Sequence, residues 1–197
     1  MKISVVINTY NEEKNIRRAI ESVKWADEVV VCDMYSEDDT AVIAKKSGAV
    51  LMFTKKVSHV EPVRNLPISK AIGDWILVLD ADEEISDTLA KKLKDIANND
   101  GVVSYVEIAR KNMIFGKWVK GSNWWPDAHI RFFRKGAVVW NDEIHSKPKT
   151  TGQGLTLPAV EELAIIHHHY VSVMQYMDRL NRYSSVQAKE LVRRALS

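Results

Sequence analysis

The chain has 197 residues and a mass of 22.4 kDa, enough for one domain with a continuous hydrophobic core. Hydrophobic residues make up 46% and charged residues 27% of the sequence, shares that exclude disordered, fibrous and multipass membrane proteins. The formal net charge of +2 at pH 7 gives no electrostatic case for nucleic-acid binding. Acidic side chains outnumber basic ones over residues 1–99, and the reverse holds over residues 100–197. This division suits a site for a metal ion and an anionic ligand.

Cys32 is the only cysteine, so the chain can form no internal disulfide, and we expect a reducing compartment. It ends an apolar run, which favours a buried thiol over a nucleophile. No long apolar stretch of a signal peptide follows Met1, and the longest apolar run, residues 75–79, is far shorter than a membrane-spanning helix. We therefore expect a cytoplasmic protein that at most contacts the inner face of a membrane peripherally; the sequence does not specify its oligomeric state.

Short apolar runs predict four strands in the first half of the chain, over residues 3–7, 28–32, 50–53 and 75–79. We expect helices between them. Asn11 is positioned to cap the first helix, because its side chain can accept hydrogen bonds from the free amides of the first turn. Residues 40–47 predict another helix, ended by Gly48. The alternation predicts an α/β sandwich around a mostly parallel sheet.

The second half of the chain has a less regular pattern. Ser86 can cap a helix that runs to about residue 97, and further strands are predicted over residues 102–108, 130–133 and 137–140. Ser172 and Gln175 form a capping box that opens a last helix. We expect one domain over residues 1–170 with a C-terminal helical appendage over residues 171–197. We interpret its basic side chains as a solvated face rather than a patch for anionic lipid.

Polar and acidic residues follow three of the predicted strands, over residues 8–12, at Asp33 and over residues 80–84. In such sheets, ligands bind beyond the carboxyl ends of the strands. Asp80 and Asp82 project two carboxylates around the small Ala81, which suits a hard divalent ion that also binds phosphate oxygens. A solvated acidic turn is the alternative, since this pattern is common. Glycine-rich dinucleotide and P-loop motifs are absent, so those site types lack their mechanism.

Several segments together form a longer pattern: SVVINTYNEE over residues 4–13, VCD over 31–33 with SEDDT over 36–40, RN over 64–65, and AIGDW over 71–75 leading into DADE over 80–83. In order, spacing and strand context they resemble the family 2 glycosyltransferases with a GT-A fold. The resemblance is closest to the branch of lipopolysaccharide core β-glucosyltransferases. It implies a nucleotide-sugar half over residues 1–99 and an acceptor half over residues 100–170.

The resemblance implies that Thr9, Tyr10 and Glu12 line the base and ribose of the donor nucleotide. It implies that Asp33 accepts a hydrogen bond from a uracil ring. These residues stand at the ends of the first two predicted strands.

The resemblance also implies a diphosphate and metal site. Arg64 matches a residue near the ribose and diphosphate, and a guanidinium offers a fixed fork for phosphate oxygens. Asp80 matches an acid near the ribose or sugar, Ala81 lies between the two acids, and Asp82 matches the ligand of Mg²⁺ or Mn²⁺. His145 stands where a further metal ligand or diphosphate contact is expected, although Ser146 follows it where a Glu is usual.

Residues 124–136, WWPDAHIRFFRKG, resemble the family segment in which Glu-Asp precedes an apolar residue, an Arg and a Gly. Pro126 stands where the Glu is usual, and Asp127 then matches the catalytic base that takes a proton from the acceptor hydroxyl. Asp142 and Glu143 are the alternatives for this base.

Trp124 and Trp125 precede this segment and have two interpretations. They form either a platform for the apolar face of an acceptor sugar or interior anchors. The run of three histidines over residues 167–169 favours a structural or surface role over metal binding, because neighbours on a strand point to alternate faces.

Together these patterns predict an inverting glycosyltransferase. It would move a hexose, most simply from a UDP-sugar, to a hydroxyl of a glycan or lipid-linked acceptor in cell-envelope polysaccharide or lipopolysaccharide synthesis, by a metal-assisted single displacement. The main alternative is a non-catalytic nucleotide-binding protein, kept open by Pro126 and Ser146. A sugar nucleotidyltransferase ranks last, because residues 8–13 lack the glycine-rich loop it needs.

Overall fold

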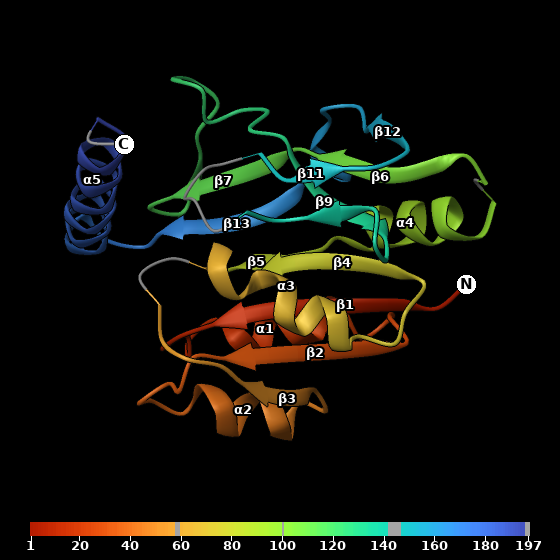
Figure 1. The fold of residues 1–197 in the computed structure, drawn as a ribbon, viewed down its shortest axis with the longest axis horizontal. Helices are drawn as coiled ribbons and strands as arrows, with labels where there is room; N and C mark the ends of the chain where they lie inside the picture. The colour runs from red at the N-terminus through yellow and green to blue at the C-terminus, as the bar shows by residue number, and fades with distance from the viewer. Residues whose placement is uncertain (58–59, 100, 142–146, 196–197) are drawn as a thin grey trace.

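A seven-stranded sheet forms the centre of the computed structural model, which describes residues 1–57, 60–99, 101–141 and 147–195 (Figure 1). Its strands, in spatial order, are β12 (Gln153–Thr156), β6 (Val103–Ile108), β9 (His129–Arg134), β4 (Trp75–Asp80), β1 (Ile3–Thr9), β2 (Glu28–Asp33) and β3 (Val50–Phe53). Among these described strands only β9 runs against its neighbours, β4 and β6. The prediction of a mostly parallel sheet is therefore confirmed.

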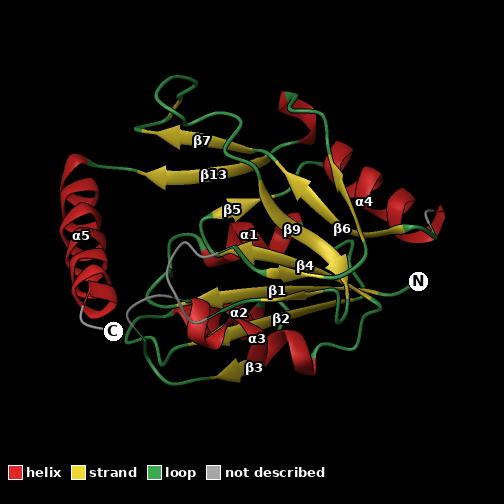
Figure 2. Ribbon diagram, turned by 45° about the horizontal axis from the view of Figure 1, so that its top comes forward, coloured by secondary structure: helices red, strands yellow, loops and turns green. Residues whose placement is uncertain are grey.

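Helices cover both faces of this sheet, which explains why β1 is buried along its whole length. On one face α1 (Ile16–Ser22), α2 (Thr40–Lys46) and α4 (Asp87–Asn99) pack against Val5, Ile7 and Leu77. On the other face α3 (Glu61–Lys70) packs against Val6 and Val78 (Figure 2). Successive side chains of a strand point to opposite faces, so each central strand contributes to both cores.

A second sheet of four strands lies beside the first and was not predicted from the sequence. Its order is β5 (Glu83–Glu84), β13 (Ile165–Tyr170), β7 (Arg110–Ile114) and β8 (Lys117–Trp118). β5 follows β4 directly, so this sheet begins at the acidic segment 80–84.

Smaller elements complete the fold: the pair β10 (Val138–Val139) and β11 (Lys149–Thr150), the short helix η1 (Glu161–Leu163), and α5 (Val173–Ala195). α5 follows β13 and stands at the edge of the molecule (Figure 1). No helix within the described ranges is long and apolar enough to cross a membrane.

The predicted helix caps have different outcomes. Ser86 Oγ accepts a hydrogen bond from the Leu89 amide at 3.1 Å, which confirms its capping role for α4. Ser172 also caps α5, since its Oγ accepts from the Gln175 amide at 3.2 Å. The return bond differs from that of a capping box, because Gln175 Oε1 accepts from the Val171 amide at 2.8 Å, one residue before the cap.

The prediction that Asn11 caps α1 is wrong. Asn11 has a φ of 53°, and its side-chain oxygen accepts from the Glu37 amide at 2.8 Å, so it ties its loop to the loop after β2. α1 begins five residues later, at Ile16, and Asn15 precedes it without a side-chain cap. Cys32 is buried, as expected.

We predict that Gly73→Ala destabilises the protein, because a Cβ at Gly73 would lie 2.5 Å from the backbone nitrogen of Ser4 in β1. Such overpacking costs about 1–3 kcal/mol, measurable as a lower free energy of unfolding in urea. Gly101→Ala is the matched control, because a Cβ there meets nothing within 4 Å. Equal unfolding free energies for the two variants would contradict the prediction.

Candidate active site

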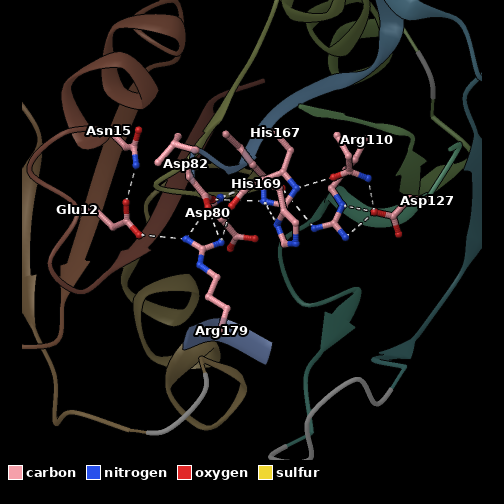
Figure 3. Close-up of polar contacts among 12 residues, drawn as sticks. Glu12, Asn15, Asp80, Asp82, Arg110, Asp127, His167, His169 and Arg179 are labelled. Carbon is pink, nitrogen blue, oxygen red and sulfur yellow. Dashed lines mark hydrogen bonds and ion pairs between the residues drawn. The ribbon is translucent and has the colours of Figure 1, made fainter. Parts of the chain in front are cut away.

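The carboxyl ends of β1, β2 and β4 meet at one edge of the large sheet. Asn8 pairs with Asp80 on β4, and Thr9 pairs with Asp33 on β2. The prediction that these strand ends lie together is therefore confirmed. Beyond them a series of polar contacts extends towards the small sheet (Figure 3).

Asp80 belongs to a buried cluster of charges. Its Oδ2 accepts a hydrogen bond from Arg131 Nη2 at 2.9 Å, and the same nitrogen donates to Glu83 Oε1 at 2.8 Å. Arg64 of α3 lies 3.5 Å from Asp80 Oδ1. Burial works to raise the pKa of Asp80, but the charges of Arg131 and Arg64 outweigh it and hold the pKa far below its ordinary value.

Several buried polar atoms beside Asp80 lack a partner among the described residues. They are the Nε atoms of Arg64 and Arg131, the side-chain amide of Asn8 and the hydroxyl of Thr9. Arg64 also stacks on Trp140, with its guanidinium 5.5 Å from the ring centre. Buried donors and acceptors are normally paired, so this group of atoms has capacity to bind a polar ligand.

Asp82 follows Ala81, which is buried in the core, and its own carboxylate is also nearly buried. Its Oδ1 lies 3.6 Å from His167 Nε2, and its Oδ2 accepts from Arg179 Nη1 and Nη2 at 3.2 Å each. Burial raises the pKa of Asp82, while His167 and Arg179 lower it to about 2. Asp82 is therefore ionised at neutral pH.

The histidine run lies on β13 and partly enters this site. His168 points away from Asp82 and contacts Glu84 Oε1 at 2.9 Å, as the alternation of a strand predicts. His167 and His169 point to the opposite side of the strand from His168. His167 Nε2 lies 3.1 Å from His169 Nδ1 and 3.6 Å from Asp82 Oδ1. These two side chains lie beside Asp82 because β13 adds to the second sheet beside β5. The preference for a structural or surface role over metal binding stays a prediction.

His167 and Asn112 link Asp82 to Asp127 in a continuous series of polar contacts. His167 Nδ1 lies 2.6 Å from Asn112 Oδ1, and Asn112 Nδ2 donates to Asp127 Oδ2 at 2.9 Å. Because the Asn112 amide nitrogen also donates to the Trp124 carbonyl, its oxygen is the acceptor and His167 Nδ1 carries the proton. His167 Nε2 is the ring atom that faces Asp82 Oδ1.

Asp127 is strongly paired. Its Oδ2 accepts from Arg110 Nη2 at 2.7 Å and Nε at 3.0 Å, and its Oδ1 lies 3.0 Å from His129 Nε2. Burial raises the pKa of Asp127, but His129, Arg110 and Asn112 together hold it far below its ordinary value. The carboxylate is ionised and can accept a proton, with low basicity.

The donor-side residues of the first two strands differ in exposure. Asp33 is fully buried, and both its carboxylate oxygens accept from Ser36. Tyr10 lies outside the core, donates to Glu37 Oε1 at 3.1 Å and stacks under the Lys56 ammonium. Burial and the nearby charge of Asp82 raise the pKa of Glu12. Glu12 Oε1 lies 3.7 Å from Arg179 Nη2.

The two tryptophans before Asp127 point to different partners. Trp124 contacts the His169 ring, with centres 5.3 Å apart, and Trp125 meets Trp118 edge-on at 5.0 Å. Both are only partly buried, so their rings are available beside the base candidate. Asp142, Glu143 and His145, which the sequence also suggested for the site, lie outside the described residues.

Sequence analysis missed five residues that the fold brings to this site: Glu83, Arg110, Asn112, Arg131 and Arg179. Glu83 adjoins the predicted acidic pair, and Arg131 falls inside the segment that contains Asp127. No sequence motif marked Arg110, Asn112 or Arg179 as a site residue. The first two lie on β7 and the third on α5, and contacts between elements distant in sequence bring them to the site.

Comparison with known proteins gives a consistent result. Residues 4–151 match the family described as glycosyl transferase family 2. An uncharacterized glycosyltransferase of Rickettsia typhi (strain ATCC VR-144 / Wilmington) is 33% identical over 98% of this chain and 68% of its own length. The SPbeta prophage-derived glycosyltransferase SunS of Bacillus subtilis (strain 168) is 26% identical over 85% of this chain and 40% of its own.

The crystal structure of TarS from S. aureus superposes on 70% of this chain and 29% of TarS, with a TM-score of 0.56 and 23% identity. This likeness concerns the fold alone. It agrees with the expected GT-A type of α/β sandwich, with its mostly parallel central sheet.

We predict that Arg131→Met lowers the free energy of unfolding by about 3–5 kcal/mol, because it leaves the fully buried Glu83 carboxylate and the partly exposed Asp80 carboxylate without their shared partner. Urea unfolding measures the change. Arg17→Met, at an exposed position of α1, is the control and is expected to cost little. A loss as small as that of the control would refute a structural role for the cluster.

The depressed pKa of Asp127 predicts a pH-dependent stability. Its ionised form is favoured in the folded state, so its contribution is present above the unfolded pKa of about 4 and is lost as pH falls below it. Between about pH 5 and pH 2, thermal unfolding of wild type should therefore lose more stability than that of Asp127→Asn. Asp95→Asn, an exposed carboxylate on α4, should follow wild type. Parallel pH profiles for all three would contradict the assignment.

Proposed function

The chain belongs to glycosyl transferase family 2, and from this premise we propose that it transfers a hexose from a UDP-sugar to a hydroxyl of a glycan or lipid-linked acceptor. The observation that carries the proposal is the series of contacts from Asp82 through His167 and Asn112 to Asp127. It joins a carboxylate suited to a metal ion and a carboxylate suited to a base within one site.

For the donor, the proposal assigns the nucleotide to the carboxyl edge of β1, β2 and β4. Thr9, Tyr10, Glu12 and Asp33 lie there in the segments that resemble the family's nucleotide loop. The unpaired buried Nε of Arg64 supports a phosphate or ribose contact next to Asp80.

For the metal, Asp82 and His167 form a fitting pair of ligands for Mg²⁺ or Mn²⁺. The Asp82 carboxylate is ionised, and His167 Nε2 lies 3.6 Å from its Oδ1 because the ring is held at Nδ1 by Asn112. The described residues contain no group of three or more His, Cys, Asp or Glu side chains that could hold a metal. A bound ion would thus depend on diphosphate oxygens and water for its other ligands, and would neutralise charge on the leaving diphosphate.

For the chemistry, Asp127 takes the proton of the acceptor hydroxyl. The hydroxyl oxygen attacks the anomeric carbon from the side opposite the diphosphate, the bond to the diphosphate oxygen breaks with its electron pair, and the configuration inverts. Arg110 and Asn112 hold Asp127 in one orientation. Trp124 and Trp125 adjoin Asp127 and offer aromatic faces for the apolar side of an acceptor sugar.

The envelope pathway and the cytoplasmic location belong to this proposal as well. Their support is the resemblance of residues 4–83 to lipopolysaccharide core β-glucosyltransferases and the single buried thiol of Cys32.

A non-catalytic nucleotide-binding protein is the second candidate, and one observation favours it. Asp127 is paired with the Arg110 guanidinium and also hydrogen-bonds to His129 and Asn112, so its basicity is low for a general base. Such a protein would bind UDP and a metal ion without turnover of any sugar nucleotide.

Two substitutions test the proposal in transfer or donor hydrolysis with a panel of nucleotide sugars and Mn²⁺. Asp82→Ala should remove metal-dependent turnover and weaken UDP binding, since it deletes the metal carboxylate. Asp127→Asn should retain UDP binding but lower kcat by about 10²–10⁴-fold, the typical contribution of a general base.

Asp95→Asn on α4 is the control and should keep full turnover. If wild type binds UDP yet turns over no donor in the panel, the non-catalytic candidate replaces the proposal. Full turnover by Asp82→Ala would remove the assignment of the metal site.

A further inference from the structure

Arg179 of the C-terminal helix reaches into the candidate active site. It lies near the start of α5, and its guanidinium faces Asp82, the backbone of β13 and Glu12 (Figure 3). Nη1 and Nη2 both donate to Asp82 Oδ2 at 3.2 Å, and Nη1 donates to the His169 carbonyl at 3.1 Å. Glu12 Oε1 lies 3.7 Å from Nη2.

This arrangement puts a positive charge on the carboxylate that the proposed function gives to the metal ion. The Arg179 and Asp82 side chains are 16% and 9% exposed, so water screens their attraction only weakly. A divalent ion bound to Asp82 would meet a guanidinium of like charge at contact distance. The two cations therefore compete for Asp82 rather than occupying it together.

Among the side chains of α5 that the structure describes, none is buried, and Gln175 and Arg179 are half-buried. Besides the Arg179 contacts, the Tyr176 ring of α5 meets the Tyr170 ring at 5.0 Å. Other apolar side chains of the helix, such as Met174 and Leu191, are largely exposed. A change of the Arg179 side chain towards a ligand beside Asp82 would therefore displace no buried apolar side chain of the described part of the helix.

A nucleoside diphosphate supplies such a partner. Arginine binds phosphate oxygens with two parallel hydrogen bonds, which are stronger than the pair of 3.2 Å contacts it makes to one oxygen of Asp82. We propose that Arg179 is a donor-binding residue that is held on Asp82 in the free protein and transfers to the donor diphosphate when the metal ion takes Asp82. This inference rests on the proposed function, and it gives α5 a role in donor binding.

The proposal predicts effects of opposite sign for the metal ion alone and for the metal with nucleotide. Arg179→Ala removes the competitor from Asp82, so Mn²⁺ alone, titrated by electron paramagnetic resonance, should bind about tenfold more tightly. The same variant lacks the phosphate contact, so calorimetry with UDP at saturating Mn²⁺ should show about tenfold weaker binding.

Two further variants make this test specific. Arg179→Lys keeps the charge but loses the planar fork, so Mn²⁺ alone should bind as in wild type while UDP with Mn²⁺ binds more weakly. Leu180→Ala changes the adjacent exposed residue of α5 and should leave both affinities unchanged. A purely structural anchor of the helix would instead shift both affinities of Arg179→Ala in one direction.

Equal or parallel changes in the two affinities would overturn the role of Arg179. A different result separates it from the proposed function: if wild type binds Mn²⁺ but no UDP at saturating Mn²⁺, the donor site itself is refuted. If wild type binds UDP normally and Arg179→Ala matches it, only the present inference fails.

Discussion

The buried ion pairs of Arg131 with Asp80 and Glu83 hold the two sheets of this protein in one arrangement. Arg131 lies on β9, the antiparallel strand that the second half of the chain inserts beside β4. The fully buried Glu83 carboxylate needs a cation within bonding distance, and this strand provides one that also pairs with the partly exposed Asp80. The pairing thereby fixes where β5 begins and where β13 can add to it.

That constraint positions the rest of the candidate site. With β13 beside β5, His167 comes to lie against Asp82, and its register with β7 sets it opposite Asn112. Asn112 in turn holds the segment that carries Asp127. The polar path from Asp82 to Asp127 is thus a product of strand pairing in the small sheet, although its two ends are 45 positions apart in the chain.

The charges of the site are balanced in pairs. Arg131 and Arg64 neutralise Asp80, Arg110 neutralises Asp127, and Arg179 neutralises Asp82. Of these, the Arg179 pair joins the site to the most exposed helix of the described fold. The sequence predicted that the basic side chains of this helix face solvent. One of them, Arg179, instead pairs with the nearly buried Asp82 carboxylate, so the C-terminal helix takes part in the site.

The sequence by itself determined the strands of the central sheet except β12, the caps at Ser86 and Ser172, and the gathering of Asp33, Asp80 and Asp82 at one sheet edge. These follow from apolar periodicity and from the geometry of parallel strands, which are local properties. The motifs over residues 4–83 also indicated the glycosyltransferase family, and the family match over residues 4–151 confirms it.

Only the tertiary structure decided the partners of those acids. The position of Asn11 depends on hydrogen bonds to a loop 26 residues later, and the roles of His167, Arg110 and Arg179 depend on contacts between distant elements. A charged or polar side chain has no intrinsic periodicity that marks its partner, since the partner is chosen by which strands pair and which faces they bury. For this reason the acids could be predicted from the sequence, and the cations that balance them could not.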